Sequence, residues 1–177
     1  SNQHGKILLA GANTYTGATT VNGGTLGVAN NNGLGTTAGG VSVASGATLD
    51  FQNVAVGAES MTALAGTLKA STGNSTYSGT IALTGNSVID VGGSSLTLSG
   101  VISDASARTL TKNGAGTAIL SGANTTYDGA VTVSAGTLAV SNASALGTTT
   151  GNVTVNSGAT LDVRATTITS GEAVTLA

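Results

Sequence analysis

Three charged residues have the types and spacing that come closest to a chemical site. Asp50, Lys69 and Asp90 follow one another at nearly equal intervals along the chain. If each interval is one turn of a stacked coil, the two carboxylates lie about 9.6 Å apart, with the lysine between them. A glycosidase acid–base pair has a similar separation. We favour a structural interpretation, an outer charge ladder of solvated side chains, because the seven acidic residues are otherwise scattered along the chain.

Other groups that do chemistry are scarce. The only histidine, His4, stands beside the first residue and is interpreted as inert, and the chain has no cysteine nucleophile. Aromatic residues make up 2% of the sequence, too few for the platforms on which sugars stack. Gly92-Gly93-Ser94 lacks the aspartate of calcium-binding nonapeptide repeats. We therefore predict no catalytic residue, no metal site and no cofactor, and we predict that the chain is not an enzyme.

The composition excludes several other classes of protein. A net charge of −2 with five Lys and Arg gives no electrostatic footprint for nucleic acid. No apolar run reaches the roughly 18 residues needed to span a bilayer, so we expect no membrane insertion of this segment. We also expect no signal peptide within these residues. A hydrophobic content of 40% argues against disorder.

The elements that must position these residues are short strands. Alternating runs such as Val41-Ser42-Val43 and Val131-Thr132-Val133 are typical of strands with one buried face. Turn signals such as Asn113-Gly114 separate them. Helix signals are almost absent, because Gly, Thr, Ser, Asn and Val are mediocre or poor helix formers.

The sequence repeats on two scales. The segment from Tyr15 to Asp50 returns at constant spacing as the segment from Tyr127 to Asp162. The shared positions of this long repeat are Asn13, Tyr15, Gly17, Gly24 and Leu26, which return as Asn124, Tyr127, Gly129, Gly136 and Leu138. A partial copy contains Tyr77 and Gly79, so all three tyrosines belong to one Thr-Tyr-x-Gly turn.

A shorter period of about 22 residues lies inside the long one. An apolar residue recurs at Leu26, Leu49, Leu68, Ile89, Leu110, Leu138 and Leu161. One such unit cannot bury its own apolar face, whereas stacked copies can. The pattern predicts an all-β fold, a parallel β-helix (solenoid) of about eight coils, right-handed and three-sided, with residues 1–177 as a single segment. An antiparallel sandwich is the competing fold, but it gives no reason for this spacing.

Stacking the seven apolar positions predicts whole columns of side chains. The preceding positions form a threonine ladder on the outer face, including Thr109, Thr137 and Thr160. Two positions after each apolar residue the side chains should point inward again, with Lys112 as the exception. We therefore expect the fifth coil to bend or end its strand at Lys112.

The repeat resembles a known family. Residues 110–117, 120–129 and 136–138 look like the passenger-associated transport repeat of bacterial autotransporters, also called the autotransporter-associated β-strand repeat. Residues 9–17 and 23–26 match more closely in their turn, because the second copy carries an inserted Thr and Asp128. The two copies cover about a third of the chain.

The resemblance implies a segment excised from a longer passenger domain, with no catalytic residues to carry over. Its implied partner is the protein's own C-terminal outer-membrane β-barrel, and its implied location is the bacterial surface or the extracellular space, reached by type V secretion. We expect a structural stalk that supports export, folding and surface presentation. The alternative is an adhesin interface, linked to virulence, for self-association or for a host surface or glycan; a polysaccharide-degrading enzyme ranks third. The absence of Cys and Pro suits a chain that must stay unfolded during export.

Overall fold

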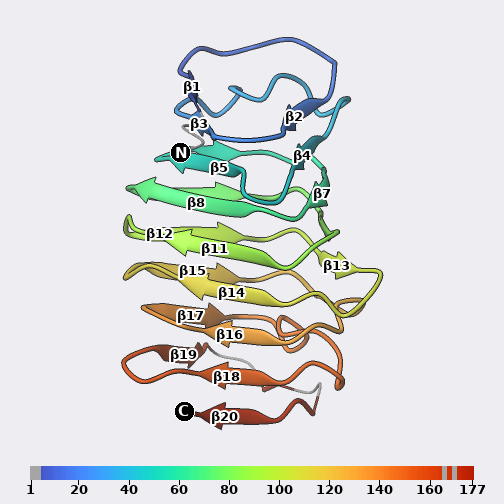
Figure 1. Cartoon of the computed structure of the whole chain (residues 1–177), viewed down its shortest axis with the longest axis vertical. Helices are drawn as coiled ribbons and strands as arrows, with labels where there is room; N and C mark the ends of the chain where they lie inside the picture. Colours follow the sequence, from blue (N-terminus) through green and yellow to red (C-terminus); the bar gives the residue numbers. More distant parts are fainter. Residues whose placement is uncertain (1–4, 165–166, 169–170) are drawn as a thin grey trace.

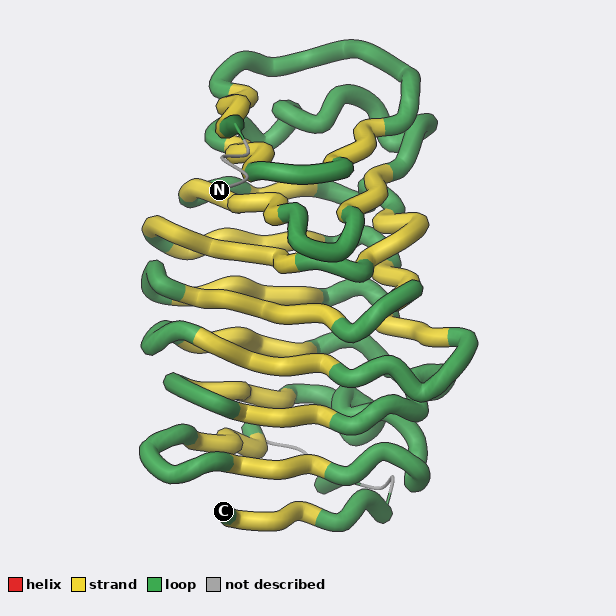
Figure 2. Tube along the Cα trace, in the orientation of Figure 1, coloured by secondary structure: helices red, strands yellow, loops and turns green. Residues whose placement is uncertain are grey.

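The chain forms a β-solenoid in which three parallel sheets stack coil upon coil (Figures 1 and 2). The computed structural model describes residues 5–164, 167–168 and 171–177. All regular structure in these residues is strand, and they contain no helix of the length and apolar character needed to cross a membrane. The all-β, three-sided architecture of about eight turns confirms the fold predicted from the repeats.

Sheet 1 has nine strands and runs the whole length of the solenoid. Its strands are β1 (Lys6–Leu9), β3 (Thr25–Val28), β5 (Thr48–Gln52), β8 (Thr67–Thr72), β11 (Ser87–Val91), β14 (Leu110–Asn113), β16 (Val131–Val133), β18 (Val153–Val155) and β20 (Val174–Leu176). Strands β1 and β20 are its two free edges, at opposite ends of the molecule (Figure 1).

Two shorter sheets form the other sides. Sheet 2 consists of β2 (Thr19–Val21), β4 (Val41–Val43), β7 (Met61–Leu64), β10 (Ile81–Leu83) and β13 (Ile102–Asp104). Sheet 3 consists of β6 (Ala55–Val56), β9 (Asn74–Tyr77), β12 (Ser95–Leu98), β15 (Thr117–Leu120), β17 (Thr137–Val140) and β19 (Thr160–Val163). Loops therefore take the place of sheet 2 in the last coils and of sheet 3 in the first two.

The core is a set of inward columns of aliphatic side chains. In sheet 1, Leu26, Leu49, Leu68 and Ile89 pair in direct register and are all buried, as the period predicts. Full burial of one such side chain contributes roughly 1.5–3 kcal/mol. Because strand residues alternate in direction, the neighbouring residues of each strand face outward.

The predicted column is wrong beyond its fourth residue. The partner of Ile89 is Lys112, whereas Leu110 pairs with Ser87, two positions away. Leu138 and Leu161 lie in a different sheet, where they pair with each other on strands β17 and β19.

The reason is that the sequence repeat is not a whole number of coils. In sheet 1, Thr25 is connected through five successive register pairs to Thr132. In the sequence repeat, Thr25 corresponds to Thr137. Thr137 follows Thr132 in the chain and lies on strand β17 of sheet 3. Thus β2 and β3 lie in sheets 2 and 1, whereas their copies β16 and β17 lie in sheets 1 and 3.

The outer threonine ladder of sheet 1 is longer than the period predicts. After Val88 it continues through Thr111, Thr132, Thr154 and Thr175. The predicted members Thr137 and Thr160 pair with each other on sheet 3 instead, and Thr109 precedes β14.

Lys112 points into the solenoid, contrary to prediction. Its residue is 1% exposed and occupies the column of Ile89 and Val133. Its ammonium donates to the carbonyls of Asn113 and Gly114, both at 2.8 Å, and of Ala135 at 3.1 Å. Three carbonyls of two successive corners thus replace water around the charge, and the strand ends at Asn113, one residue later than predicted.

Candidate functional site

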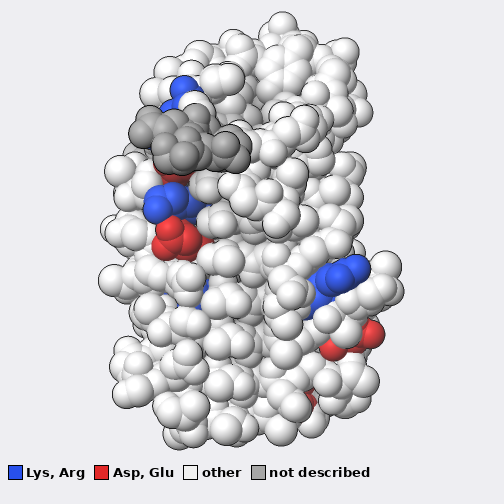
Figure 3. Space-filling view, in the orientation of Figure 1, with Lys and Arg blue, Asp and Glu red and all other residues white. Residues whose placement is uncertain are grey.

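The charged column lies on the outer face of sheet 1. Asp50 pairs in register with Lys69, and Lys69 with Asp90. Lys69 Nζ lies 2.7 Å from Asp90 Oδ2, and the hydrogen bond to Asp90 raises the pKa of the lysine. Figure 3 shows charged side chains near the upper part of this face, whereas most of its lower half is uncharged.

Asp50 differs from the solvated ladder residue that the sequence suggested. It is 3% exposed, and its carboxylate accepts hydrogen bonds from Ser71 N at 3.1 Å, Ser71 Oγ at 2.9 Å and Gln52 Nε2 at 2.9 Å. Both oxygens are therefore engaged in holding two adjacent coils together. Lys69 lies between the two aspartates and forms an ion pair with Asp90. Both aspartates therefore make structural contacts.

The repeat residues come together at the corners of the solenoid, where each coil meets the one before it. Tyr77 and Tyr127 are buried, and their hydroxyls donate to carbonyls of the preceding coil, those of Glu59 and Arg108 respectively. Burial raises the pKa of both phenols, so they remain neutral donors. Tyr77 closes strand β9 rather than lying in a turn.

The glycine two positions after each of these two tyrosines accommodates the same carbonyl. A Cβ at Gly79 would overlap the Glu59 carbonyl, and one at Gly129 would overlap that of Arg108. The Tyr-x-Gly pattern therefore has a direct physical meaning. The hydroxyl binds the corner of the preceding coil, and the missing side chain lets that corner approach.

The repeat asparagines link coils as well. Asn124 is buried; its Oδ1 accepts from Ile102 N of the preceding coil at 2.7 Å, and its Nδ2 donates to Ala145 O of the following coil at 2.6 Å. Asn13 makes the corresponding bond to the following coil, from Nδ2 to Gly33 O at 2.7 Å. These are structural amides that connect successive coils.

The remaining repeat residues shape the turns before two strands. Gly24 and Gly136 have φ values of 72° and 64°, a conformation that residues with a side chain rarely adopt. Each directly precedes a strand, β3 or β17, whose second residue, Leu26 or Leu138, packs into the core.

Asp104 and Asp128 hold the loop of residues 105–109. Asp104 accepts from Arg108 N at 2.6 Å and from Asp128 N at 3.1 Å, and Asp128 accepts from Ala107 N at 3.0 Å. Asp128, which stands where the first copy has Thr16, therefore binds the loop of residues 105–109 in the preceding coil.

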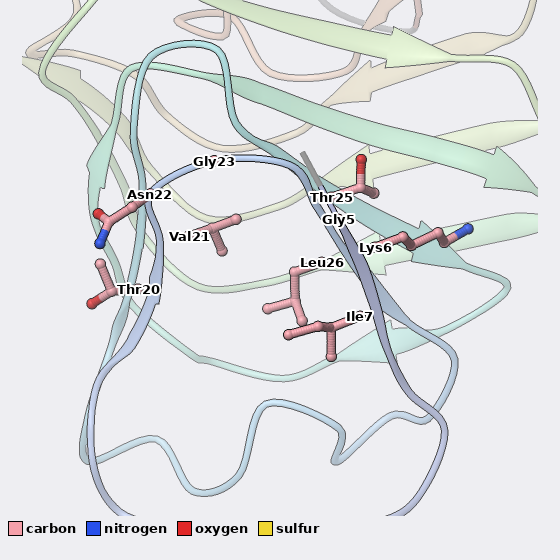
Figure 4. Close-up of a pocket in the computed structure, with 9 residues that line it drawn as sticks. All are labelled: Gly5, Lys6, Ile7, Thr20, Val21, Asn22, Gly23, Thr25 and Leu26. Carbon is pink, nitrogen blue, oxygen red and sulfur yellow. The ribbon is translucent and has the colours of Figure 1, made fainter. Parts of the chain in front are cut away.

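A hollow of about 270 Å³ opens at the N-terminal end (Figure 4). Ile7, Val21 and Leu26 line it with apolar side chains, and Lys6 and Asn22 stand at its polar rim. It lies between β1 and β2, both of which are edge strands. The described residues contain no group of three or more His, Cys, Asp or Glu suited to a metal ion.

Stacked coils, a continuous core and corner residues that reach back to the preceding coil define a parallel β-solenoid repeat protein. The family model of the passenger-associated-transport-repeat matches residues 5–28 and 110–140. These two segments contain the predicted copies, so the resemblance to this repeat is confirmed. The match is consistent with an autotransporter passenger domain that contains such repeats. The match implies secretion to the cell surface. No curated protein and no solved structure matches the chain.

Proposed function

We propose that this chain is a rigid, non-catalytic stalk segment of an autotransporter passenger, and that its repeat corners assist export and folding. Its partner in export is the passenger's own outer-membrane β-barrel. The observation that carries the proposal is the corner contact itself. Each buried tyrosine binds the backbone of the coil before it, and its glycine lets that backbone approach, so one folded coil is a specific template for its neighbour.

The physical argument rests on locality. Each strand of sheet 1 pairs only with its neighbours in the stack, so folding can propagate one coil at a time. The lack of Cys and Pro removes disulfide formation and prolyl isomerisation as slow steps. A coil that folds outside the cell hinders the chain from sliding back, which gives export a direction.

The test uses two deletions of equal length in the full-length passenger. Deleting residues 111–131 removes one coil with Tyr127 and Gly129, and deleting residues 154–174 removes the same number of residues without a tyrosine and outside the matched repeats. Each deletion joins neighbouring positions of the outer threonine column and so leaves that column in register. Surface display is measured with antibody on intact cells and by protease accessibility. We expect display to fall only for 111–131; normal display of both variants contradicts the export role.

A second candidate function is adhesion through the outer face of sheet 1. Thr111, Thr132, Thr154 and Thr175 form an unbroken column there, on the largely uncharged half seen in Figure 3. Such a column offers regularly spaced hydroxyls to another rod or to a glycan. Replacing Thr132 and Thr154 together by Lys should then abolish clumping of cells that display the passenger, without reducing display. Unchanged clumping assigns adhesion to another part.

A further inference from the structure

The corner after β14 brings together an asparagine, a glycine and a buried ammonium. Asn113 ends the strand, and Gly114 follows it with a φ of 78°. In an Asn-Gly step the backbone nitrogen of the glycine can attack the side-chain amide carbon of the asparagine, because the glycine has no side chain to hinder the approach. The attack expels ammonia and closes a five-membered succinimide ring. The corner therefore contains both reacting groups of a deamidation.

Neither reacting group at this corner is held by another contact. The side-chain amide of Asn113 and the N–H of Gly114 form no hydrogen bond within the described residues, and both residues are half-buried. Asn32-Gly33 differs, because the N–H of Gly33 donates to Asn30 O at 2.9 Å and Gly33 is buried. Of these two Asn-Gly steps, the one at Asn113 is thus the one available to react.

Lys112 acts on the peptide bond that joins the two reacting residues. Its ammonium donates to Asn113 O at 2.8 Å, which is the carbonyl oxygen of that bond. A cation on this oxygen makes the N–H of the same peptide group more acidic, so Gly114 N loses its proton more readily and becomes a better nucleophile. The contact is fixed in the folded chain, because Lys112 is 1% exposed and also donates to Gly114 O and Ala135 O.

The same contact decides how the succinimide opens. Attack of water on the former side-chain carbonyl gives aspartate. Attack on the main-chain carbonyl gives isoaspartate, in which the chain runs through the side chain and the main-chain carbonyl has become a free carboxylate. Because the Lys112 ammonium donates to the main-chain oxygen, it stabilises the negative charge that develops there during the attack. Isoaspartate is therefore the favoured product at this corner.

We propose that Asn113 is a self-modification site, which converts to isoaspartate under the direction of Lys112. The net reaction takes the asparagine amide and one water and yields a carboxylate and an ammonium ion, with no oxidation or reduction. The new carboxylate arises at the atom that Lys112 Nζ contacts, so an ion pair replaces a hydrogen bond to a neutral carbonyl. The loss of ammonia makes the conversion one-way, so the converted fraction records the age of the rod. This inference does not depend on the proposed role in export.

Peptide mapping by mass spectrometry after incubation at neutral pH tests the proposal, since electron-transfer fragmentation distinguishes isoaspartate from aspartate. Asn22-Gly23 is the reference within the same chain, because both residues are exposed and no described lysine donates to Asn22 O. We expect deamidation at Asn113, with a ratio of isoaspartate to aspartate at least about twofold higher than at Asn22. An unmodified Asn113, or equal ratios at the two positions, overturns the proposal.

Two further samples separate the lysine from the local sequence. Wild type in urea keeps the sequence and loses the contact, so the two ratios should become equal. Folded Lys112→Met loses the ammonium, so Asn113 should react more slowly and with the ratio of the reference. The control Lys6→Met removes an exposed lysine and should leave the reaction of Asn113 unchanged. An excess of isoaspartate that persists in urea or in Lys112→Met contradicts the role of Lys112.

The new ion pair gives an independent readout. Burial lowers the pKa of Lys112 to about 8, and a carboxylate at the main-chain position should raise this pKa in the incubated protein. The titration is followed by NMR of the side-chain carbon next to the ammonium. Asn113→Asp has the mass of the converted protein but carries its carboxylate on the outer face, in register with Asp90, so it is the matched control and should shift the pKa less. Equal shifts, or no shift after incubation, refute the predicted position of the carboxylate.

Discussion

Lys112 makes the stability of this solenoid depend on pH in an unusual direction. Burial lowers the pKa of its ammonium from 10.5 to about 8, although the nearby Asp90 opposes the shift. Below pH 8 both the folded and the unfolded chain carry the proton. Between pH 8 and 10.5 the unfolded chain holds it more tightly, so the free energy of unfolding rises with pH.

The magnitude follows from the two pKa values. The gain from this group alone should be about 1 kcal/mol at pH 9 and about 2–3 kcal/mol at pH 10, relative to pH 7. Lys112→Met keeps the length of the side chain and removes the titrating group. The wild-type protein should therefore gain stability relative to this variant as the pH rises.

Urea denaturation followed by circular dichroism at pH 7, 9 and 10 measures the effect. Tyr77 and Tyr127, whose pKa values are raised by burial, favour the opposite slope above pH 10. They are present in both proteins, so they cancel in the difference. Lys6→Met, which removes an exposed lysine, serves as the control and should keep the wild-type profile. Parallel pH profiles for wild type and Lys112→Met would refute the argument.

Three further predictions concern the corners and the core. Tyr127→Phe removes the hydroxyl that binds the preceding coil and should cost about 1–2 kcal/mol of unfolding free energy, whereas Tyr15→Phe should cost under about 0.5 kcal/mol. Gly129→Ala forces two coils apart and should lower the urea midpoint strongly, while Gly17→Ala should leave it unchanged; equal effects contradict the steric argument. Leu68→Ala empties part of a fully buried position and should cost about 2–5 kcal/mol by the same denaturation assay.

The fold could be predicted from the sequence because strand alternation and repeat length both point to stacked coils. The first four residues of the apolar column could be predicted as well, because each interval between Leu26 and Ile89 is one whole coil. The later columns could not be read from the repeat alone. The constant spacing of the two long copies looks like a spatial period. Only the pairing of Thr25 with its successors shows that Thr132, and not Thr137, stands five coils further along its column.

The sequence reveals the candidate site as a motif but does not reveal its role. The motif predicts turns, and Tyr127 lies in one, but Tyr77 ends strand β9 and both hydroxyls bind the preceding coil. The glycine shared at the second position after each tyrosine was the available signal. The charge of Lys112, taken alone, predicts an outward side chain. Its alternation with Leu110 indicates the inward face, and the turn at Asn113 and Gly114 supplies the carbonyls that make this acceptable.

Because the sequence repeat is not a whole number of coils, its two copies face different sides of the solenoid. An antibody that recognises the outer surface of the first repeat and cross-reacts with the second would bind on two different sides of the rod, about 24 Å apart along its axis. Duplicating residues 25–136, one full sequence repeat, likewise turns everything after the duplication by one side. Duplicating residues 25–131, five whole coils, lengthens the rod and leaves each face pointing where it did. The length of a duplication thus determines the direction in which the distant end of the rod faces.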